Sequence, residues 1–342
     1  MTISSYGDAA YSFRTRSRAN VWHLFLALVS FASLLPFVAI PFAQHIIPKT
    51  MSALFIVAAL NFIGANFHVA STGWFYTDPA MRSHFRANPL RYLIMPGLLV
   101  AGSAAAFCFL DPSLSLYLLI PFFCWQLWHY QKQNSGLLSF IAAGTDGVAL
   151  SSWERRTLAL SAVAGMMGFF HLFDIGLPNL SSEFMSLHQV GAAICWLLPV
   201  AFCISVIKTP ALRTNRLRFV FFLFGTLFFL PTFIFSDAVS ATLGYALSHG
   251  LQYLVFMGFV SVGKKKPIAS LLVLLAMATL GGLLLNMALA PDWLASPSGR
   301  ATFGVFVGVV MAHFVVDAGV WRLREAFQRR YMREKFSFIF NR

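Results

Sequence analysis

The chain has 342 residues, of which 58% are hydrophobic and only 11% are charged. Soluble domains carry roughly 25% charged residues, so this composition excludes an ordinary soluble domain and predicts a polytopic membrane protein. The formal net charge of +13 does not indicate nucleic acid as a partner, because the basic residues form short runs between apolar segments instead of one patch.

Ten segments of the sequence approach the length of about 20 apolar residues that crosses the core of a bilayer. A polar arm, residues 1–21, precedes the first of them. In chain order the segments are 22–43, 51–77, 92–110, 113–131, 157–177, 185–207, 217–236, 239–262, 267–290 and 300–321. The sequence therefore predicts one all-α domain over 22–321, a polytopic transmembrane helical bundle of about ten spans, and a basic tail over 322–342.

Lysine and arginine concentrate on one side of this predicted bundle. With ten spans, 23 of the 25 basic residues fall on the side of the two termini, and only Lys49 and Arg300 fall on the other. Cytoplasmic loops of membrane proteins carry an excess of these residues. We therefore predict that both termini are cytoplasmic, in an integral protein of a bacterial inner membrane.

Two stretches fit this scheme less simply. Residues 135–150 are apolar but short and contain three glycines, which predicts an interfacial or re-entrant piece on the cytoplasmic side. The basic tail after Trp321 has two interpretations. It could continue the last helix and lie against anionic lipid, or it could be a solvated segment.

Six histidines lie inside the predicted spans, where a polar side chain usually needs a partner or a function. They are His68, His129, His171, His188, His249 and His313. A helix rises by about 1.5 Å per residue, and the predicted spans alternate in direction, so each histidine can be placed in depth. Four of them fall in the central or cytoplasmic part of the bilayer, whereas His171 and His188 fall near the other surface.

The inner histidines have the features of metal ligands. Neutral imidazole binds metals readily, and its second ring nitrogen usually donates to an oxygen that fixes the tautomer. His313 and Asp317 stand at i and i+4, so both side chains emerge on one face of a helix. We predict a metal site in the membrane with iron as the preferred ion. Its ligands would be His68, His129, His249, His313 and Asp317.

Further polar residues accompany both groups of histidines. Gln133 and Gln252 each follow an inner histidine by one helical turn. They are predicted to support the ligands by hydrogen bonds without binding the ion themselves. At the outer surface, Asp174 follows His171 by three residues, and His188 begins the next span. These three residues form a second candidate site.

Three functions compete for such a set of residues. The preferred one is a metal-dependent membrane oxidoreductase of the oxygenase type, in which non-haem iron acts on a hydrophobic, lipid-soluble substrate and an electron donor supplies electrons. The first alternative is a b-type haem cytochrome that moves electrons across the bilayer between inner and outer histidine pairs. The second is a proton- or ion-coupled transporter. The H-x-x-H-H boxes of desaturases, a P-loop and a G-x-S-x-G elbow are all missing from the sequence.

Overall fold

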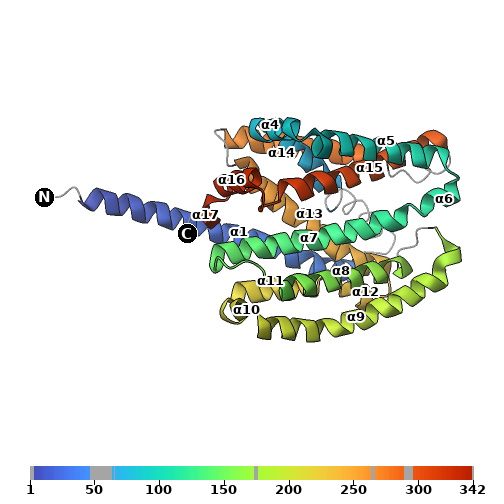
Figure 1. Cartoon of the computed structure of the whole chain (residues 1–342), viewed down its shortest axis with the longest axis horizontal. Coiled ribbons are helices and arrows are strands. Elements are labelled where there is room, and N and C mark those ends of the chain that lie inside the picture. Colours follow the sequence, from blue (N-terminus) through green and yellow to red (C-terminus); the bar gives the residue numbers. More distant parts are fainter. Residues whose placement is uncertain are drawn as a thin grey trace.

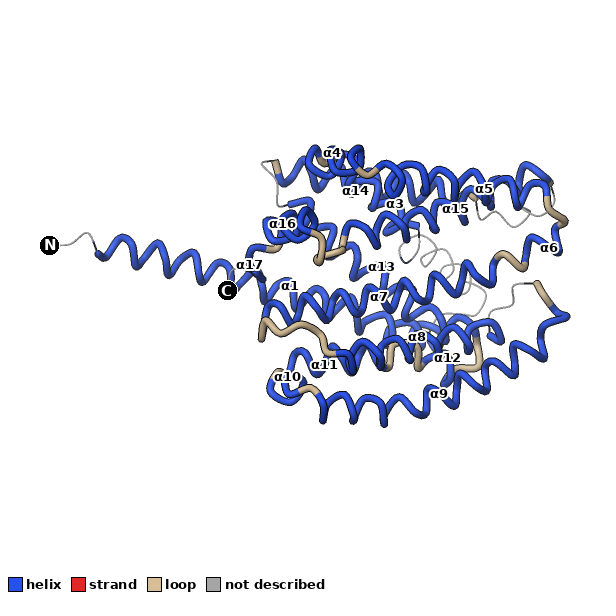
Figure 2. The backbone as a smooth tube through the Cα atoms, viewed as in Figure 1, coloured by secondary structure: helices blue, strands red, loops and turns tan. Residues whose placement is uncertain are grey.

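The structure is a computed structural model of the chain and describes residues 4–46, 64, 66–172, 176–262, 266–288 and 296–340. Within these ranges helices joined by short loops are the only regular elements, with no strand (Figure 2), which confirms the predicted all-α fold. The helices are α1 (Ser4–Ile46), α3 (His68–Ser71), η2 (Thr72–Thr77), α4 (Pro79–Ala87), η3 (Leu90–Ile94), α5 (Met95–Phe109), α6 (Pro112–Leu116), α7 (Leu119–Thr145), α8 (Ser152–Leu172), η4 (Pro178–Leu180), α9 (Ser181–Lys208), α10 (Pro210–Thr214), α11 (Arg216–Thr226), α12 (Pro231–Ile234), α13 (Ala238–Val262), α14 (Pro267–Met287), α15 (Pro297–Val320), α16 (Ala326–Lys335) and α17 (Ser337–Phe340).

The long helices lie side by side in one bundle (Figure 1). Helix α15 packs along α5, α8 along α9, and α1 along α13, while α7 contacts α8 and α11. The N-terminal part of α1 projects beyond the bundle, and both termini lie at the same end of it, together with the short helices α4, α10 and α16 (Figure 1). Helices α5 and α9 form two opposite edges, with α7 and α13 between them.

Six helices within the described ranges are long and apolar enough to cross a membrane. They are Ala19–Ile40, Leu90–Phe109, Pro178–Lys208, Ala238–Val262, Pro267–Met287 and Pro297–Val320. A segment of about 20 apolar residues matches the thickness of the hydrocarbon core. The chain is therefore an α-helical, multi-pass integral membrane protein by the length and composition of its helices.

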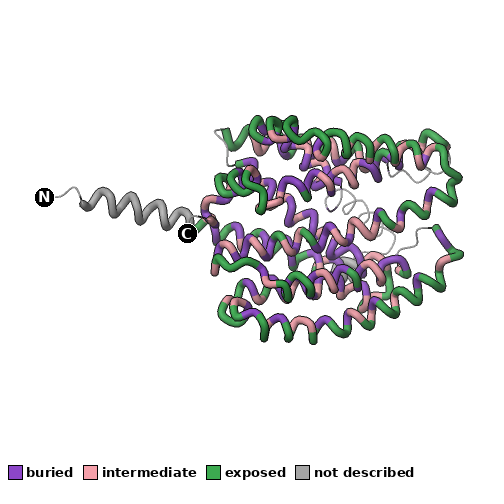
Figure 3. Tube along the Cα trace, in the orientation of Figure 1, coloured by how far each residue is buried: buried purple, intermediate pink, exposed green. Residues whose placement is uncertain are grey.

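The distribution of apolar side chains over the bundle agrees with a lipid environment. Large apolar residues are exposed at its edges, including Phe109 of α5, which is 85% exposed, and Trp196 of α9, which is 81% exposed. Figure 3 shows exposed residues along both edges and buried residues in the middle. A soluble monomer rarely exposes large contiguous apolar surfaces, so these edges fit contact with acyl chains.

Four predicted segments do not appear as single long apolar helices among the described residues. Segment 51–77 falls mostly outside them, and what is described there forms the short helices α3 and η2. Segment 113–131 is divided between α6 and α7, and segment 217–236 between α11 and α12, with Pro231 at the start of α12. Segment 157–177 overlaps α8, which begins earlier, with Glu154 in its first turn. Polar residues and helix breaks are tolerated here because these elements pack against other helices.

The stretch predicted to be interfacial or re-entrant is part of a helix. Helix α7 runs without interruption to Thr145, so the prediction for its apolar part was wrong. One of its glycines serves close packing: a Cβ on Gly144 would lie only 2.5 Å from the Trp22 indole of α1. The Gln131 amide also donates to the carbonyl oxygens of Leu158 and Gly225, both at 2.9 Å, which ties α7 to α8 and α11.

The basic tail folds back onto the bundle, unlike both interpretations from the sequence. Helix α15 ends at Val320, and α16 packs its buried face, with Tyr331 and Met332, against the core. The Tyr331 hydroxyl donates to the Asp78 carboxylate at 3.2 Å, and Asp78 also caps the N-terminus of α4. Burial, together with this carboxylate, raises the pKa of Tyr331 above its usual range. The apolar face of α16 is thus occupied by protein instead of lipid.

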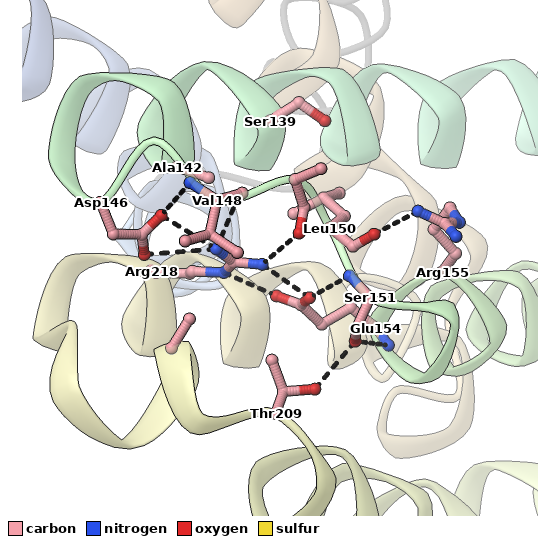
Figure 4. A network of polar contacts seen from close by, with 12 residues as sticks. Ser139, Ala142, Asp146, Val148, Leu150, Ser151, Glu154, Arg155, Thr209 and Arg218 are labelled. Atoms are coloured by element: carbon pink, nitrogen blue, oxygen red, sulfur yellow. Dashed lines mark hydrogen bonds and ion pairs between the residues drawn. The ribbon is translucent and has the colours of Figure 1, made fainter.

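A buried arginine joins the α7–α8 loop to α11 (Figure 4). The Arg218 guanidinium is completely buried and donates to both oxygens of Glu154, each at 2.8 Å. It also donates to Asp146 at 3.1 Å and to the carbonyl oxygens of Val148 and Ala149 at 2.9 and 3.2 Å. A guanidinium has five N–H donors in a fixed fork, and this arrangement uses all of them. We call these five residues the arginine clasp.

Two glycines bring α15 against the backbone of α5. A Cβ on Gly304 would lie 2.5 Å from the Ser103 carbonyl oxygen, and one on Gly308 would lie 2.5 Å from the Val100 Cα atom. This is the small-xxx-small pattern of close helix pairs in membranes. Because the obstructing atoms are backbone atoms, they cannot move aside as the end of a side chain can.

We expect Gly308→Leu to separate α15 from α5 and to destabilise the protein by about 3 kcal/mol or more, since overpacking of a tight contact costs about 1–3 kcal/mol even where side chains can adjust. Thermal unfolding in detergent would measure the change. Gly102→Leu is the matched control, because a Cβ on Gly102 of α5 has no atom within 4 Å. Equal melting temperatures for the two variants would contradict the prediction.

Candidate metal centre

The four inner histidines come from four different helices and meet at one point inside the bundle. His68 belongs to α3, His129 to α7, His249 to α13 and His313 to α15. Their ring centroids form a closed square with sides of 4.7, 5.0, 5.1 and 5.1 Å. Neighbouring ring planes are inclined by 75° to 86°. All four side chains are buried, with at most 6% exposure.

The size of the square suits a metal ion. A square with sides near 5 Å has its centre about 3.5 Å from each corner, and an imidazole nitrogen that binds at about 2.1 Å places its ring centroid at a similar distance from the ion. The ligand nitrogens of His68, His249 and His313 all lie within 4.8 Å of one another. These three histidines could therefore hold one ion together.

Asp317 adds a carboxylate to the same site from α15. One of its oxygens lies 3.8 Å from the Nε2 atom of His129. The ligand atoms of His129, His313 and Asp317 also lie within 4.8 Å of one another, so His313 belongs to two overlapping triads. The five inner residues predicted as ligands thus lie together in the structure.

Among the residues that the structure describes, several nitrogens of the histidine square have no hydrogen-bond partner. These atoms are both ring nitrogens of His68 and His249, and the Nε2 atoms of His129 and His313. The Gly64 carbonyl lies near the His68 ring, but without good hydrogen-bond geometry. A buried polar atom without a partner costs about 1–3 kcal/mol. Such a cost at four neighbouring rings is explained if the nitrogens bind an ion.

Three further side chains surround His313 and Asp317. The Thr72 hydroxyl lies 2.7 Å from the Nδ1 atom of His313 and 2.8 Å from the Tyr253 hydroxyl. The Trp321 indole donates to Asp317 at 2.6 Å. The Tyr253 hydroxyl also interacts with the Asp317 carboxylate. Because its Nδ1 atom is engaged by Thr72, His313 has a single free nitrogen, Nε2.

Thr72, Tyr253 and Trp321 were not among the residues predicted for this site. The signal was nevertheless present. Tyr253 follows His249 by four residues, and Trp321 follows Asp317 by four, so each lies on the same helix face as a predicted ligand. Aromatic side chains inside a membrane span are common as packing residues. For this reason the sequence alone did not distinguish Tyr253 and Trp321 from packing residues.

The two glutamines predicted to support the ligands lie beside the square, and one of them, Gln133, binds its backbone. The Gln133 amide donates to the His249 carbonyl oxygen at 2.8 Å and to the Gln252 side-chain oxygen at 3.0 Å. The Gln252 amide donates to the Ser33 hydroxyl of α1 at 2.8 Å. Within the described residues their hydrogen bonds connect α7, α13 and α1 around His249, and none of them reaches an imidazole nitrogen.

A backbone contact fixes the separation of His68 and His249. A Cβ on Gly250 would lie 2.6 Å from the Gly64 carbonyl oxygen. Gly250 directly follows His249, and Gly64 precedes His68 by one helical turn. The absence of side chains at both positions allows the two segments to approach, and this brings the two rings to 4.7 Å.

The outer histidines form a separate pair. The rings of His171 and His188 lie 5.0 Å apart, and the His188 Nδ1 atom lies 3.1 Å from the Gly168 carbonyl oxygen. His171 is exposed. Asp174, predicted as the third member, lies outside the described residues. The described histidines, cysteines and acidic residues that could hold an ion together are all in the inner group.

The fold and this site define an α-helical membrane protein whose buried histidine and aspartate side chains could hold a metal ion. The chain matches no protein-family model, no curated protein and no solved structure. We therefore infer its function from the geometry of the site.

Proposed function

We propose that this protein is a membrane-embedded, metal-dependent oxidoreductase of the oxygenase type. The observation that supports this most is the square of four imidazoles around one centre, with ring separations of 4.7 to 5.1 Å and nitrogens that lack other partners. With Asp317 beside it, the square contains two overlapping triads, which together comprise five ligand groups.

Iron suits this donor set best. Imidazole and carboxylate ligands together are typical of non-haem iron sites that keep a position open for oxygen or substrate. Five ligand groups leave one of the six positions of an octahedral ion free. A bound iron would supply the activation of oxygen, and His68, His129, His249, His313 and Asp317 would hold it.

The surroundings of the site favour a lipid-soluble substrate. The Tyr130 ring lies 4.2 Å from the His249 ring, and the Phe314 ring stacks on His129 at 4.6 Å. The site thus has aromatic walls inside an apolar bundle, where a polar substrate would lose its hydration. We propose that a hydrophobic small molecule reaches it from the bilayer and that an external electron donor serves the reaction.

The ring separations favour an ion over a haem. A haem with two axial histidines places a flat macrocycle between the two imidazoles. The inner rings pack against one another at about 5 Å in edge-to-face contacts, as His68 does with both His249 and His313, so a macrocycle would have to force them apart. We therefore prefer a non-haem metal enzyme to a b-type cytochrome.

We also propose the finer topology: about ten spans, both termini in the cytoplasm, and location in a bacterial inner membrane. The shared position of the termini at one end of the bundle supports this proposal (Figure 1). The basic helices α4, α10 and α16 lie at that same end, as expected for a cytoplasmic face.

Elemental analysis and an absorption spectrum of one purified batch test the proposal. We expect one iron per chain and no Soret band. One ion is expected because His313, which the two candidate triads share, has only its Nε2 atom free for a metal. A strong Soret band would replace the proposal with the cytochrome. Protein that stays metal-free after growth and reconstitution with ferrous iron would refute the centre.

A further inference from the structure

A hydrogen-bonded chain connects two of the candidate ligands on one side of the square. From His313 Nδ1 it passes to the Thr72 hydroxyl at 2.7 Å and then to the Tyr253 hydroxyl at 2.8 Å. Tyr253 interacts with the Asp317 carboxylate, which also accepts the Trp321 indole N–H at 2.6 Å. Thr72, Tyr253 and Asp317 are all buried. The members of this chain come from η2, α13 and α15.

The chemistry of its members gives this chain one direction. When Asp317 is ionised, as it would be as a metal ligand, its carboxylate can only accept, so the Tyr253 proton then points to Asp317. Since a hydroxyl has a single proton, Tyr253 must then accept from Thr72. Thr72 in turn has no proton left for His313 and accepts the N–H of its Nδ1 atom. His313 therefore holds its proton on Nδ1.

The opposite nitrogen of His313 is then the one free to bind. Its Nε2 atom is buried and has no hydrogen-bond partner in the described part of the chain, and His313 belongs to both candidate triads. A neutral imidazole with its proton on Nδ1 presents a lone pair at Nε2. With Asp317 ionised, the chain thus presents the Nε2 atom of His313 as the ligand atom.

We infer that Thr72 and Tyr253 are positioning residues of the metal centre: they hold His313 in the tautomer that presents Nε2 to the ion, and they orient Asp317 as an anionic neighbour. This inference rests on the proposed metal centre and adds to it two residues that do not themselves bind the ion. Groups that orient metal ligands in this way typically change metal affinity by about 10–100-fold when they are removed.

Substitutions that change one hydroxyl at a time test the inference. Thr72→Val keeps the shape of the side chain and loses the hydroxyl, whereas Thr72→Ser keeps the hydroxyl. Tyr253→Phe and Tyr245→Phe form a second matched pair, because both tyrosines are buried on α13 and the Tyr245 ring packs against Phe228 and Phe229 instead of the square.

The full-length protein in lipid nanodiscs would be titrated with Co²⁺ in competition with a chelator, and the visible spectrum of the bound ion would be recorded. We expect Thr72→Val and Tyr253→Phe each to weaken Co²⁺ binding by about 10–100-fold and to change the spectrum. Thr72→Ser and Tyr245→Phe should stay within about threefold of the wild type. The double variant Thr72→Val/Tyr253→Phe should bind little worse than either single variant, because both changes interrupt the same chain.

The outcomes separate this inference from the proposed function. If the wild type binds Co²⁺ tightly and Thr72→Val binds it as tightly as Thr72→Ser, the positioning role is refuted while the metal centre stands. If Tyr253→Phe and Tyr245→Phe weaken binding equally, the loss reflects packing of α13, and the role of Tyr253 is likewise refuted. A wild-type protein that binds no Co²⁺ overturns both the centre and its positioning chain.

Discussion

His249→Phe is expected to lose metal binding almost completely, by about 100-fold or more, and yet to raise the melting temperature of the metal-free protein. The His249 side chain is completely buried, and neither ring nitrogen has a hydrogen-bond partner among the described residues. Without an ion, such groups cost about 1–3 kcal/mol each. Phenylalanine has a similar shape and removes that cost together with the ligand.

Metal content by mass spectrometry and thermal unfolding with and without a chelator would measure both effects. In the wild type, a bound ion should raise the melting temperature, because it stabilises only the folded state. His313→Ala should lose metal to a similar extent. His171→Ala is the matched control, since its ring lies in the outer pair, and it should keep the metal. Unchanged metal in His249→Phe, or a lower melting temperature of its metal-free form, would contradict the assignment.

The second large effect concerns the arginine clasp, where Arg218→Met is expected to destabilise the protein by about 3–5 kcal/mol. Methionine fills much of the space of the arginine stem but leaves the Glu154 carboxylate, which is completely buried, without its ion pair. An unpaired buried charge is strongly unfavourable. Thermal or denaturant unfolding in detergent would measure the loss.

The neighbouring arginine provides the control for this prediction. Arg216 begins the same helix and is exposed, so Arg216→Met should change stability by no more than about 0.5 kcal/mol. The double variant Arg218→Met/Glu154→Leu should recover more than half of the loss, because removing both partners leaves no buried charge. If the double variant is less stable than Arg218→Met alone, the loss does not come from the unpaired carboxylate.

Depth along the helices was sufficient to predict which histidines come together. The rise per residue and the alternation of the spans placed His68, His129, His249 and His313 at compatible depths, and the structure brings their rings within 5.1 Å of their neighbours. The i, i+4 spacing of His313 and Asp317 predicted that both face the same site, and their ligand atoms lie within 4.8 Å of each other.

Contacts between residues far apart in the sequence were not predictable in the same way. In the sequence, Arg218 is one of many basic residues at the ends of predicted spans. Its partners Asp146 and Glu154 lie more than 60 residues away, so the local sequence does not indicate the ion pairs. Nothing in the local pattern distinguishes a buried arginine from one that sets topology. The same holds for Thr72, whose hydroxyl reaches Tyr253 and His313 on two other helices.

Hydropathy also predicted the ends and interruptions of helices less well than their existence. Residues 113–131 are apolar enough for a span, but the structure begins a new helix at Leu119 and continues it past the predicted end to Thr145. A central helix contacts protein on most sides and can include Gln131 and Asn134, both buried, at positions where a lipid-facing helix could not. Hydropathy alone does not report which neighbours a helix will have.

The contact between Gly250 and Gly64 has a consequence for which ions the square can accept. The two backbones are already in contact at this crossing. Because neither glycine has a side chain to remove, no substitution there can bring His249 and His68 closer. The main-chain atoms at this crossing therefore set a lower limit on the separation of these two imidazoles. The range of ionic radii that the histidine square accepts would then depend on the backbone contact between Gly250 and Gly64.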